Sequence, residues 1–146
     1  IEKAADTIDI QVRQRNGKIN LMLEASEPVI RGDSEHLANL VNNLLDNALK
    51  YSPDNPDITV ETKDSERGIT MAVSDRGIGM SKSVQARIFE RFYRQTTGNV
   101  HDVKGFGLGL NYARAIIDAH KGSVTVTSEP GKGSRFEVFL PYNPEN

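Results

Sequence analysis

The sequence predicts a two-layer α/β (or α+β) sandwich, in which about three main helices cover one face of a mixed sheet of about five strands. Segments that alternate like strands occur between segments whose apolar residues recur at helical spacing. The 146-residue chain contains no cysteine, and no apolar run approaches the ~18 residues that a membrane span needs. We therefore expect a single domain without disulfides, thiolate metal sites or membrane spans.

The first half of the chain contains two predicted helices and three predicted strands. Apolar spacing predicts a first helix that ends at Asn16-Gly17, followed by a strand in residues 18–26. A second helix is predicted for residues 34–51, with Asp33 or Ser34 as N-cap and Pro53 just beyond its end. Residues 58–64 and 69–74 alternate like two strands joined by the turn SERG.

The second half contains two further helices and a hairpin. The pattern predicts a helix over residues 81–94, with Val84, Ile88 and Phe92 facing inward. Residues 95–104 show no periodicity, and a ten-residue connection exceeds the usual length, so we expect a functional lid. A last helix is predicted for residues 108–120, closed by Gly122, before a β-hairpin that turns at residues 130–133.

Four asparagines occur within nine residues of the second predicted helix. On a helical projection Asn43, Asn47 and Lys50 share a ridge beside the apolar face. Amide oxygens suit Mg²⁺, a lysine one turn later can meet a phosphate, and Tyr51 can cover a ligand. An ordinary exposed helix face explains the same pattern, and the stretch alone leaves both interpretations open.

Two glycine clusters flank the third predicted helix. In DRGIGM (residues 75–80), Asp75 can accept from an exocyclic amino group, although a plain strand-to-helix turn also fits. In GFGLGL (residues 105–110), alternate glycines precede a helix N-terminus, where unpaired N–H groups favour phosphate. This second cluster matches neither the dinucleotide fingerprint nor the P-loop, and it follows a loop where both of those need a strand, so those two nucleotide-binding folds are disfavoured.

The formal net charge of −2 gives no reason to expect nucleic acid as a partner. Residues 82–104 carry five basic side chains against Glu90 and Asp102. A local basic patch on an acidic body suits a small anionic ligand, and a solvated helix face fits the charges equally well.

Taken together, the motifs resemble the catalytic ATP-binding domain of two-component sensor histidine kinases. This domain belongs to the Bergerat-fold superfamily, with the gyrase, heat-shock chaperone and mismatch-repair ATPases. The matching stretches are NLLDNALKYSP (43–53, the N box), DRGIGM (75–80, the G1 box), IFERFYR (88–94, the F box) and GFGLGL (105–110, the G2 box). The tail at residues 119–141 matches as well, so the resemblance covers essentially the whole chain.

On the base side of the nucleotide, the resemblance implies that Asp75 binds the amino group of adenine. Gly77 and Gly79 would lie beside the base, Tyr51 would line the nucleotide, and Ser134 would join the adenine end through water.

On the phosphate side, the resemblance implies that Asn47 and Asn43 hold Mg²⁺ and that Lys50 lines the nucleotide, with Arg94 near the γ-phosphate. We add Lys104 as a phosphate contact because of its position. The resemblance also implies that the following residues anchor the lid or contact the phosphates: Phe89, Phe92, Gly105, Gly107, Leu108 and Gly109.

The resemblance implies that the chain binds ATP and Mg²⁺ and supplies the γ-phosphate for histidine autophosphorylation. No stretch resembles the family's phosphoacceptor motif, and His36, His101 and His120 are not expected to accept phosphate. We therefore expect the acceptor in an absent helical dimerisation domain. Residues 1–16 of this single domain (1–146) would be the helix that leads in from it, since that helix has no N-cap.

Further partners follow from the same resemblance. A response regulator receiver domain would act downstream, in the cytoplasm, with no nucleic acid and no direct membrane contact by this domain. Two alternatives remain: a same-fold anti-sigma serine kinase or ATP hydrolase, and a nucleotide-sensing module without catalysis. Asn43 stands where a hydrolase would need a carboxylate base, which argues against hydrolysis.

Overall fold

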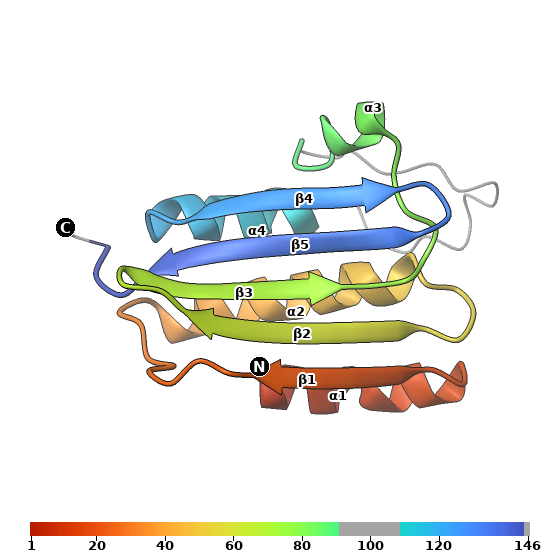
Figure 1. Cartoon of the computed structure of the whole chain (residues 1–146), viewed down its shortest axis with the longest axis horizontal. Helices are drawn as coiled ribbons and strands as arrows, with labels where there is room; N and C mark the ends of the chain where they lie inside the picture. The colour runs from red at the N-terminus through yellow and green to blue at the C-terminus, as the bar shows by residue number, and fades with distance from the viewer. Residues whose placement is uncertain (91–108, 145–146) are drawn as a thin grey trace.

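The computed structural model describes residues 1–90 and 109–144, which form a two-layer α/β sandwich (Figure 1). Five strands make one sheet in the order β1-β2-β3-β5-β4, in which β1 and β2 are parallel and all other neighbours antiparallel. The strands are β1 (Lys18–Leu23), β2 (Asp57–Asp64), β3 (Gly68–Ser74), β4 (Ser123–Glu129) and β5 (Gly133–Pro141). The predicted mixed sheet of about five strands is confirmed.

Three helices cover one face of this sheet, as predicted (Figure 1). They are α1 (Glu2–Gln14), α2 (Ser34–Lys50) and α4 (Gly109–Ala119). Helix α2 lies centrally, and its predicted N-cap forms, since the Asp33 carboxylate accepts from the backbone N–H of His36 at 2.9 Å. Within the part of the chain that is described, no helix is long and apolar enough to cross a membrane.

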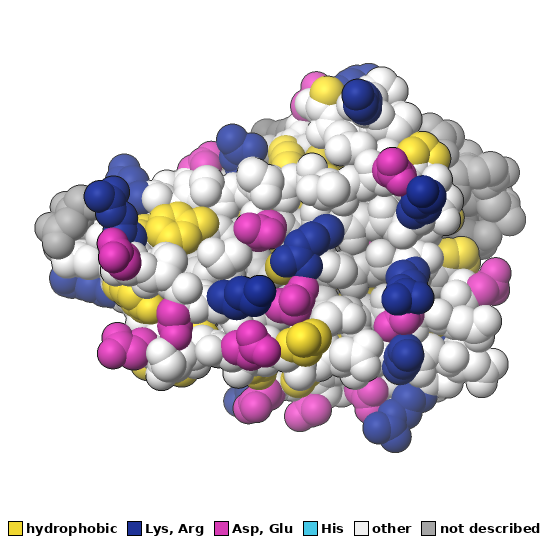
Figure 2. Space-filling model, viewed as in Figure 1, with side chains coloured by type: hydrophobic (Ala, Val, Ile, Leu, Met, Phe, Trp, Pro, Cys, Tyr) yellow, Lys and Arg dark blue, Asp and Glu magenta, His cyan; other side chains and the backbone are white. Residues whose placement is uncertain are grey.

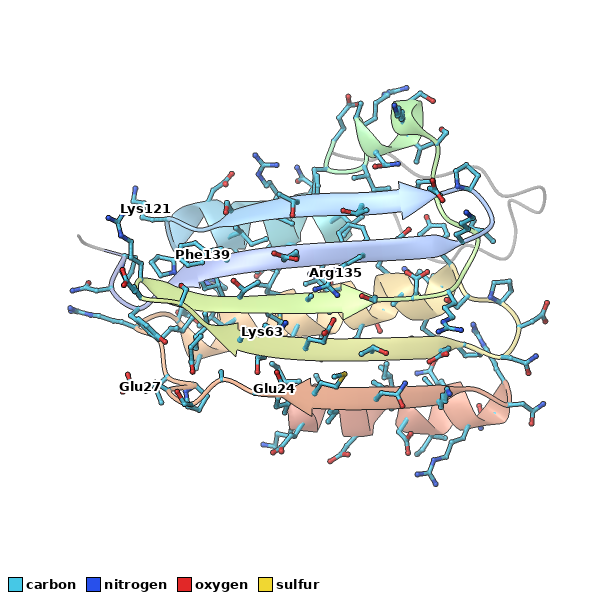
Figure 3. All side chains as sticks on the ribbon, viewed as in Figure 1. Glu24, Glu27, Lys63, Lys121, Arg135 and Phe139 are labelled. Carbon is cyan, nitrogen blue, oxygen red and sulfur yellow. The ribbon has the colours of Figure 1, made fainter. Side chains whose placement is uncertain are left out.

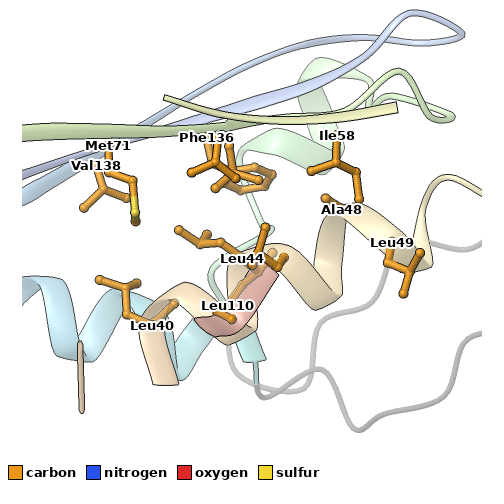
Figure 4. Packing of buried hydrophobic residues seen from close by; sticks show 14 of the residues in the cluster. Leu40, Leu44, Ala48, Leu49, Ile58, Met71, Leu110, Phe136 and Val138 are labelled. Atoms are coloured by element: carbon orange, nitrogen blue, oxygen red, sulfur yellow. The ribbon is translucent and has the colours of Figure 1, made fainter. Parts of the chain in front are cut away.

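The hydrophobic core lies between the inner face of the sheet and helices α1, α2 and α4, and Figure 4 shows part of it. Phe136 and Val138 of β5 point from the sheet towards Leu44 of α2 and Leu110 of α4. Burial of these side chains is the main favourable term that holds the two layers together.

The opposite face of the sheet carries scattered charged side chains of both signs (Figure 2). Arg135 of β5 forms ion pairs there with Glu61 and Glu137, and it donates to the Ser74 hydroxyl at 3.1 Å (Figure 3). One solvated face and one buried face are typical of an antiparallel sheet. At the ends of the strands, side chains that point to the inner face therefore lie on the side of the sheet that the helices cover.

The helix predicted for residues 81–94 is shorter than expected. Helix α3 spans only Lys82–Gln85, and turns follow to residue 90. The backbone N–H groups of Arg87 and Glu90 each bond three residues back, and the Phe89 carbonyl is taken by the side chain of Asn111 in α4. These three-residue bonds form turns over residues 86–90 in place of the expected helix, and residues 91–94 lie outside the described part.

Candidate functional site

Three elements that are distant in sequence meet where β3 ends. The backbone N–H of Asp75, directly after β3, donates to the Ser134 carbonyl at 2.8 Å and so joins β3 to the β4–β5 hairpin. The N–H of Ile78 donates to the carbonyl of Tyr51 at 3.0 Å, which fixes the next loop to the end of α2. Asp75, Tyr51 and Ser134, all predicted to lie at the base end of a nucleotide, are therefore neighbours through these backbone bonds.

Asp75 is a buried carboxylate with one engaged oxygen. Its side chain is 7% exposed, and Oδ1 accepts from the N–H groups of Gly77 at 2.8 Å and Ser134 at 3.3 Å. Among the described residues, none donates a hydrogen bond to Oδ2. Burial raises the pKa of Asp75 to about 6, against the opposing effect of the two N–H donors. At neutral pH the group is an ionised acceptor with an oxygen left for a ligand that carries N–H donors.

The loop after Asp75 requires its two glycines for packing. A Cβ on Gly77 would overlap the Tyr51 carbonyl oxygen, and it would also approach the hydroxyl of buried Ser52. Gly79 has φ of +68°, and a Cβ there would overlap the Glu129 carbonyl oxygen. The family resemblance implied that both glycines lie beside the base. The structure adds that the protein's own backbone contacts already exclude a side chain at both positions.

The polar ridge predicted on α2 is present. Asn43 and Asn47 are partly buried on α2, Lys50 is exposed at its last turn, and no described residue hydrogen-bonds to either asparagine amide. Asn43 Oδ1 lies 3.7 Å from the place that a Cβ on Gly109 would occupy. Gly109 is the first described residue of α4, so the Asn43 amide lies beside the N-terminal part of this helix, where the helix dipole favours anions.

The donor set near α2 fits Mg²⁺ held together with phosphate. In residues 1–90 and 109–144, no three His, Cys, Asp or Glu side chains are grouped to hold a metal ion. The amide oxygens of Asn43 and Asn47 are neutral oxygen donors, and Mg²⁺ commonly completes its shell with waters and substrate phosphates.

Phe89, predicted to anchor a lid, is held by contacts on several sides. Its ring packs edge-on against Phe136 with centroids 6.2 Å apart, and the Arg114 guanidinium lies 5.6 Å from the ring centroid. Its carbonyl accepts from Asn111 Nδ2 at 3.2 Å. Sequence reasoning missed Asn111 and Arg114, because neither belongs to a motif and both contacts join segments far apart in the chain.

The remaining predicted site residues lie within residues 91–108, outside the described part of the chain. They are Phe92, Arg94, Lys104, Gly105, Gly107 and Leu108. Most of the basic segment also lies there, and these assignments stay predictions.

Sequence reasoning also missed a clamp beside the Asp75 loop. Gln85 Nε2 donates to the Met80 carbonyl at 3.0 Å and to the Ser128 carbonyl at 3.1 Å, which ties the loop to β4. The hydroxyl of Ser128 accepts from the N–H of Met80 at 2.8 Å. The sequence contains no signal for this clamp, because it is formed by ordinary polar residues whose bonding partners lie 43 and 48 positions away in the chain.

Comparison with known proteins assigns this arrangement to a family. A profile described as histidine kinase-, DNA gyrase B- and HSP90-like ATPase matches residues 32–144. The chain is 43% identical over 138 residues to the sensor protein RprX of Bacteroides fragilis, covering 93% of this chain and 27% of that protein. It therefore spans about a quarter of the length of that relative.

Two solved structures have the same fold. The catalytic domain of histidine kinase ThkA superposes with a TM-score of 0.85 at 22% identity, over 99% of this chain and 91% of that chain. Full-length ShkA, solved in complex with AMPPNP, superposes with a TM-score of 0.81 at 25% identity, over 98% of this chain and 30% of that chain. The predicted fold class is confirmed.

Proposed function

Since the chain belongs to the histidine kinase-, DNA gyrase B- and HSP90-like ATPase family, we propose that it binds ATP with Mg²⁺ and supplies the γ-phosphate for histidine autophosphorylation of a sensor kinase. The runner-up reactions, serine phosphorylation and ATP hydrolysis, use the same nucleotide site. The similarity to RprX and the asparagine at position 43, in place of a carboxylate base, favour the histidine kinase.

The observation that carries the proposal is the Asp75 carboxylate. It is buried, Oδ1 is engaged by two backbone N–H groups, and Oδ2 accepts from no described residue. An ionised acceptor in a largely buried place, with an oxygen that keeps access for a ligand, suits the 6-amino group of adenine. ShkA, a structure of the same fold, was solved with AMPPNP, an analogue of ATP.

The phosphates would lie between α2 and the start of α4. Asn43 and Asn47 would hold Mg²⁺ through their amide oxygens, Lys50 would line the nucleotide, and the first N–H groups of α4 would face the phosphates. When bound, Mg²⁺ neutralises charge on the transferred phosphoryl group. We propose that Arg94, Lys104 and the glycines at 105 and 107 complete the contacts from residues 91–108.

The phosphate acceptor would be a histidine elsewhere in the full-length protein. His120 is unsuited, because it is 8% exposed, its Nδ1 donates to the Ile116 carbonyl, and its Nε2 accepts from the Asp33 N–H. We propose a helical dimerisation domain, joined through α1, as the part that carries the acceptor. A receiver domain of a response regulator would take the phosphoryl group next, in the cytoplasm.

Calorimetry of the isolated chain tests the nucleotide site. We expect ATP to bind in the presence of Mg²⁺, with lower affinity after chelation of the metal and with weak or no binding of GTP. Absence of ATP binding with Mg²⁺, by a chain shown to be folded from its circular dichroism, would contradict the proposal.

A further inference from the structure

We propose that Ser128 is a positioning residue that sets base selectivity, by holding the Ser134 hydroxyl as a hydrogen-bond acceptor towards the nucleobase. The inference rests on the proposed function, because it concerns the adenine end of the same site. It extends that function to a residue of β4 that belongs to none of the nucleotide-binding motifs.

The two serines are direct cross-strand neighbours. Ser128 of β4 pairs with Ser134 of β5, next to the pair formed by Val126 and the buried Phe136. The side chains at 128 and 134 therefore continue the inner, helix-facing side of the sheet. Their hydroxyl oxygens lie 2.8 Å apart, which is a hydrogen bond of ordinary length.

The hydrogen bonds of Ser128 determine which of the two hydroxyls donates. A serine hydroxyl has one hydrogen and two lone pairs. Ser128 Oγ donates its hydrogen to the Gly133 carbonyl at 2.9 Å and accepts the N–H of Met80 at 2.8 Å. The bond between the serines must then use the hydrogen of Ser134. Ser128 is thereby saturated, and Ser134 is left with lone pairs alone for a ligand or a bridging water.

Ser134 and Asp75 then present acceptors together. The Ser134 N–H donates to Asp75 Oδ1 at 3.3 Å, so the two side chains start from bonded backbone positions. The Asp75 carboxylate is ionised above about pH 6 and can only accept. Two acceptors select a base that offers N–H donors at this edge. The 6-amino group of adenine offers two, whereas guanine carries the acceptor O6 at the equivalent position.

The backbone around Ser128 is held by bonds that do not use its hydroxyl. Gln85 Nε2 bridges the carbonyls of Met80 and Ser128, and the Gly131 N–H donates to the Ile78 carbonyl at 2.7 Å. Removing only the hydroxyl should therefore leave the loop and the hairpin in place. Without the Ser128 hydroxyl, the Ser134 hydroxyl could rotate and donate its hydrogen to the base. The site would then tolerate a base with an acceptor at this edge, such as O6 of guanine.

The test measures the affinities of Mg²⁺·ATP and Mg²⁺·GTP for matched variants by calorimetry. Ser128→Ala should lower the ratio of ATP affinity to GTP affinity about tenfold, the effect of roughly one hydrogen bond. Ser128→Thr keeps the hydroxyl and should retain the wild-type ratio. Thr127→Ala changes an exposed neighbour on the outer face of the same strand and should have no effect.

A double-mutant cycle separates positioning from general support of the fold. Ser134→Ala should also lower the ratio, and the variant with both alanines should be no worse than Ser134→Ala alone, since Ser128 acts through Ser134. Additive effects, or an unchanged ratio in Ser128→Ala, would overturn the inference while the proposed function stands. A folded wild-type chain that binds no ATP would overturn both.

Discussion

Asp75 and Ser134 stand 59 residues apart in the sequence and are joined by backbone bonds in both directions. The Asp75 N–H donates to the Ser134 carbonyl at 2.8 Å, and the Ser134 N–H lies 3.3 Å from both the carbonyl oxygen and Oδ1 of Asp75. This pairing extends the β3–β5 ladder by one residue and holds the carboxylate in a single orientation. The proposed contact of Asp75 with adenine depends on that orientation.

Asp75→Asn should abolish tight ATP binding while the fold remains. The amide can still accept from the Gly77 and Ser134 N–H groups through its oxygen, which turns its NH₂ towards the amino group of adenine. Replacing an acceptor by a donor at this point should weaken binding by at least ~100-fold. Calorimetry with ATP measures the loss, and unchanged affinity in a folded variant would remove Asp75 from the base site.

The free energy of unfolding of the nucleotide-free chain should depend on pH through Asp75. The direction of this dependence is opposite to that of most carboxylates, whose pKa is lowered on folding. Burial raises the pKa of Asp75 to about 6, so between its unfolded value and pH 6 the folded chain binds more protons than the unfolded chain. The contribution of Asp75 to the free energy of unfolding therefore falls as the pH rises through this window. Between pH 4.5 and 7.5 the fall should be about 2 kcal/mol.

Urea unfolding of the wild type and of Asp75→Asn across this pH range isolates the effect, because other titrating groups cancel in the difference. The free energy of unfolding of Asp75→Asn, minus that of the wild type, should increase with pH and level off above about pH 7. A difference in free energy of unfolding that stays constant with pH would show that Asp75 titrates alike in the folded and unfolded chains.

Asn47→Ala should remove the dependence of ATP binding on Mg²⁺. The amide of Asn47 has no hydrogen-bond partner among the described residues, so its loss should change the free energy of unfolding by less than about 1 kcal/mol. Asn39→Ala, on the same helix and outside the predicted metal site, is the matched control. Titrations with Mg²⁺ and with chelator compare the variants, and a wild-type metal response in Asn47→Ala would contradict the assignment.

The glycines of the two clusters should respond differently to alanine. Gly77→Ala places a methyl group into the Tyr51 carbonyl, so it should lower the free energy of unfolding by about 2 kcal/mol or more. Among the described residues, the methyl group of Gly109→Ala meets nothing closer than Asn43 Oδ1 at 3.7 Å, so this change should leave stability unchanged or raise it by up to about 1 kcal/mol.

Gly109→Ala should weaken nucleotide binding although it does not lower stability. The methyl group of Gly109→Ala would lie beside the Asn43 amide and should weaken the binding of Mg²⁺·ATP in a fully folded chain. Thermal unfolding and calorimetry on both variants provide the comparison. Equal affinity for Mg²⁺·ATP in the wild type and in Gly109→Ala would separate the start of α4 from the phosphate site.

Most of the fold could be predicted because it follows from local patterns. Helix α2 was expected over residues 34–51 and spans Ser34–Lys50, since its apolar face, N-cap and following proline all agree. The last helix ends as expected near Gly122, but the left-handed residue is Lys121, with φ of +59°. Gly122 instead donates to the Ile117 carbonyl and packs closely against the carbonyl of Phe139.

The parts that could not be predicted depend on contacts between distant segments. Helix α3 ends at Gln85, and the turn after it contacts another helix through the hydrogen bond from Asn111 to the Phe89 carbonyl. The saturation of Ser128 by Met80, Gly133 and Ser134 requires the hairpin and the loop to be in place together. Periodicity and turn chemistry report local conformation, so neither reveals which polar groups meet across the fold.

Phosphoryl transfer in trans tests the central claim most directly. The chain would be incubated with γ-labelled ATP, Mg²⁺ and the separately produced dimerisation domain of its own full-length protein. We predict label on that domain that is lost in acid and retained in alkali, as expected for phosphohistidine, and no label with Asp75→Asn. Acid-stable label on serine, or release of free phosphate alone, would contradict the assignment of this chain as a histidine kinase domain.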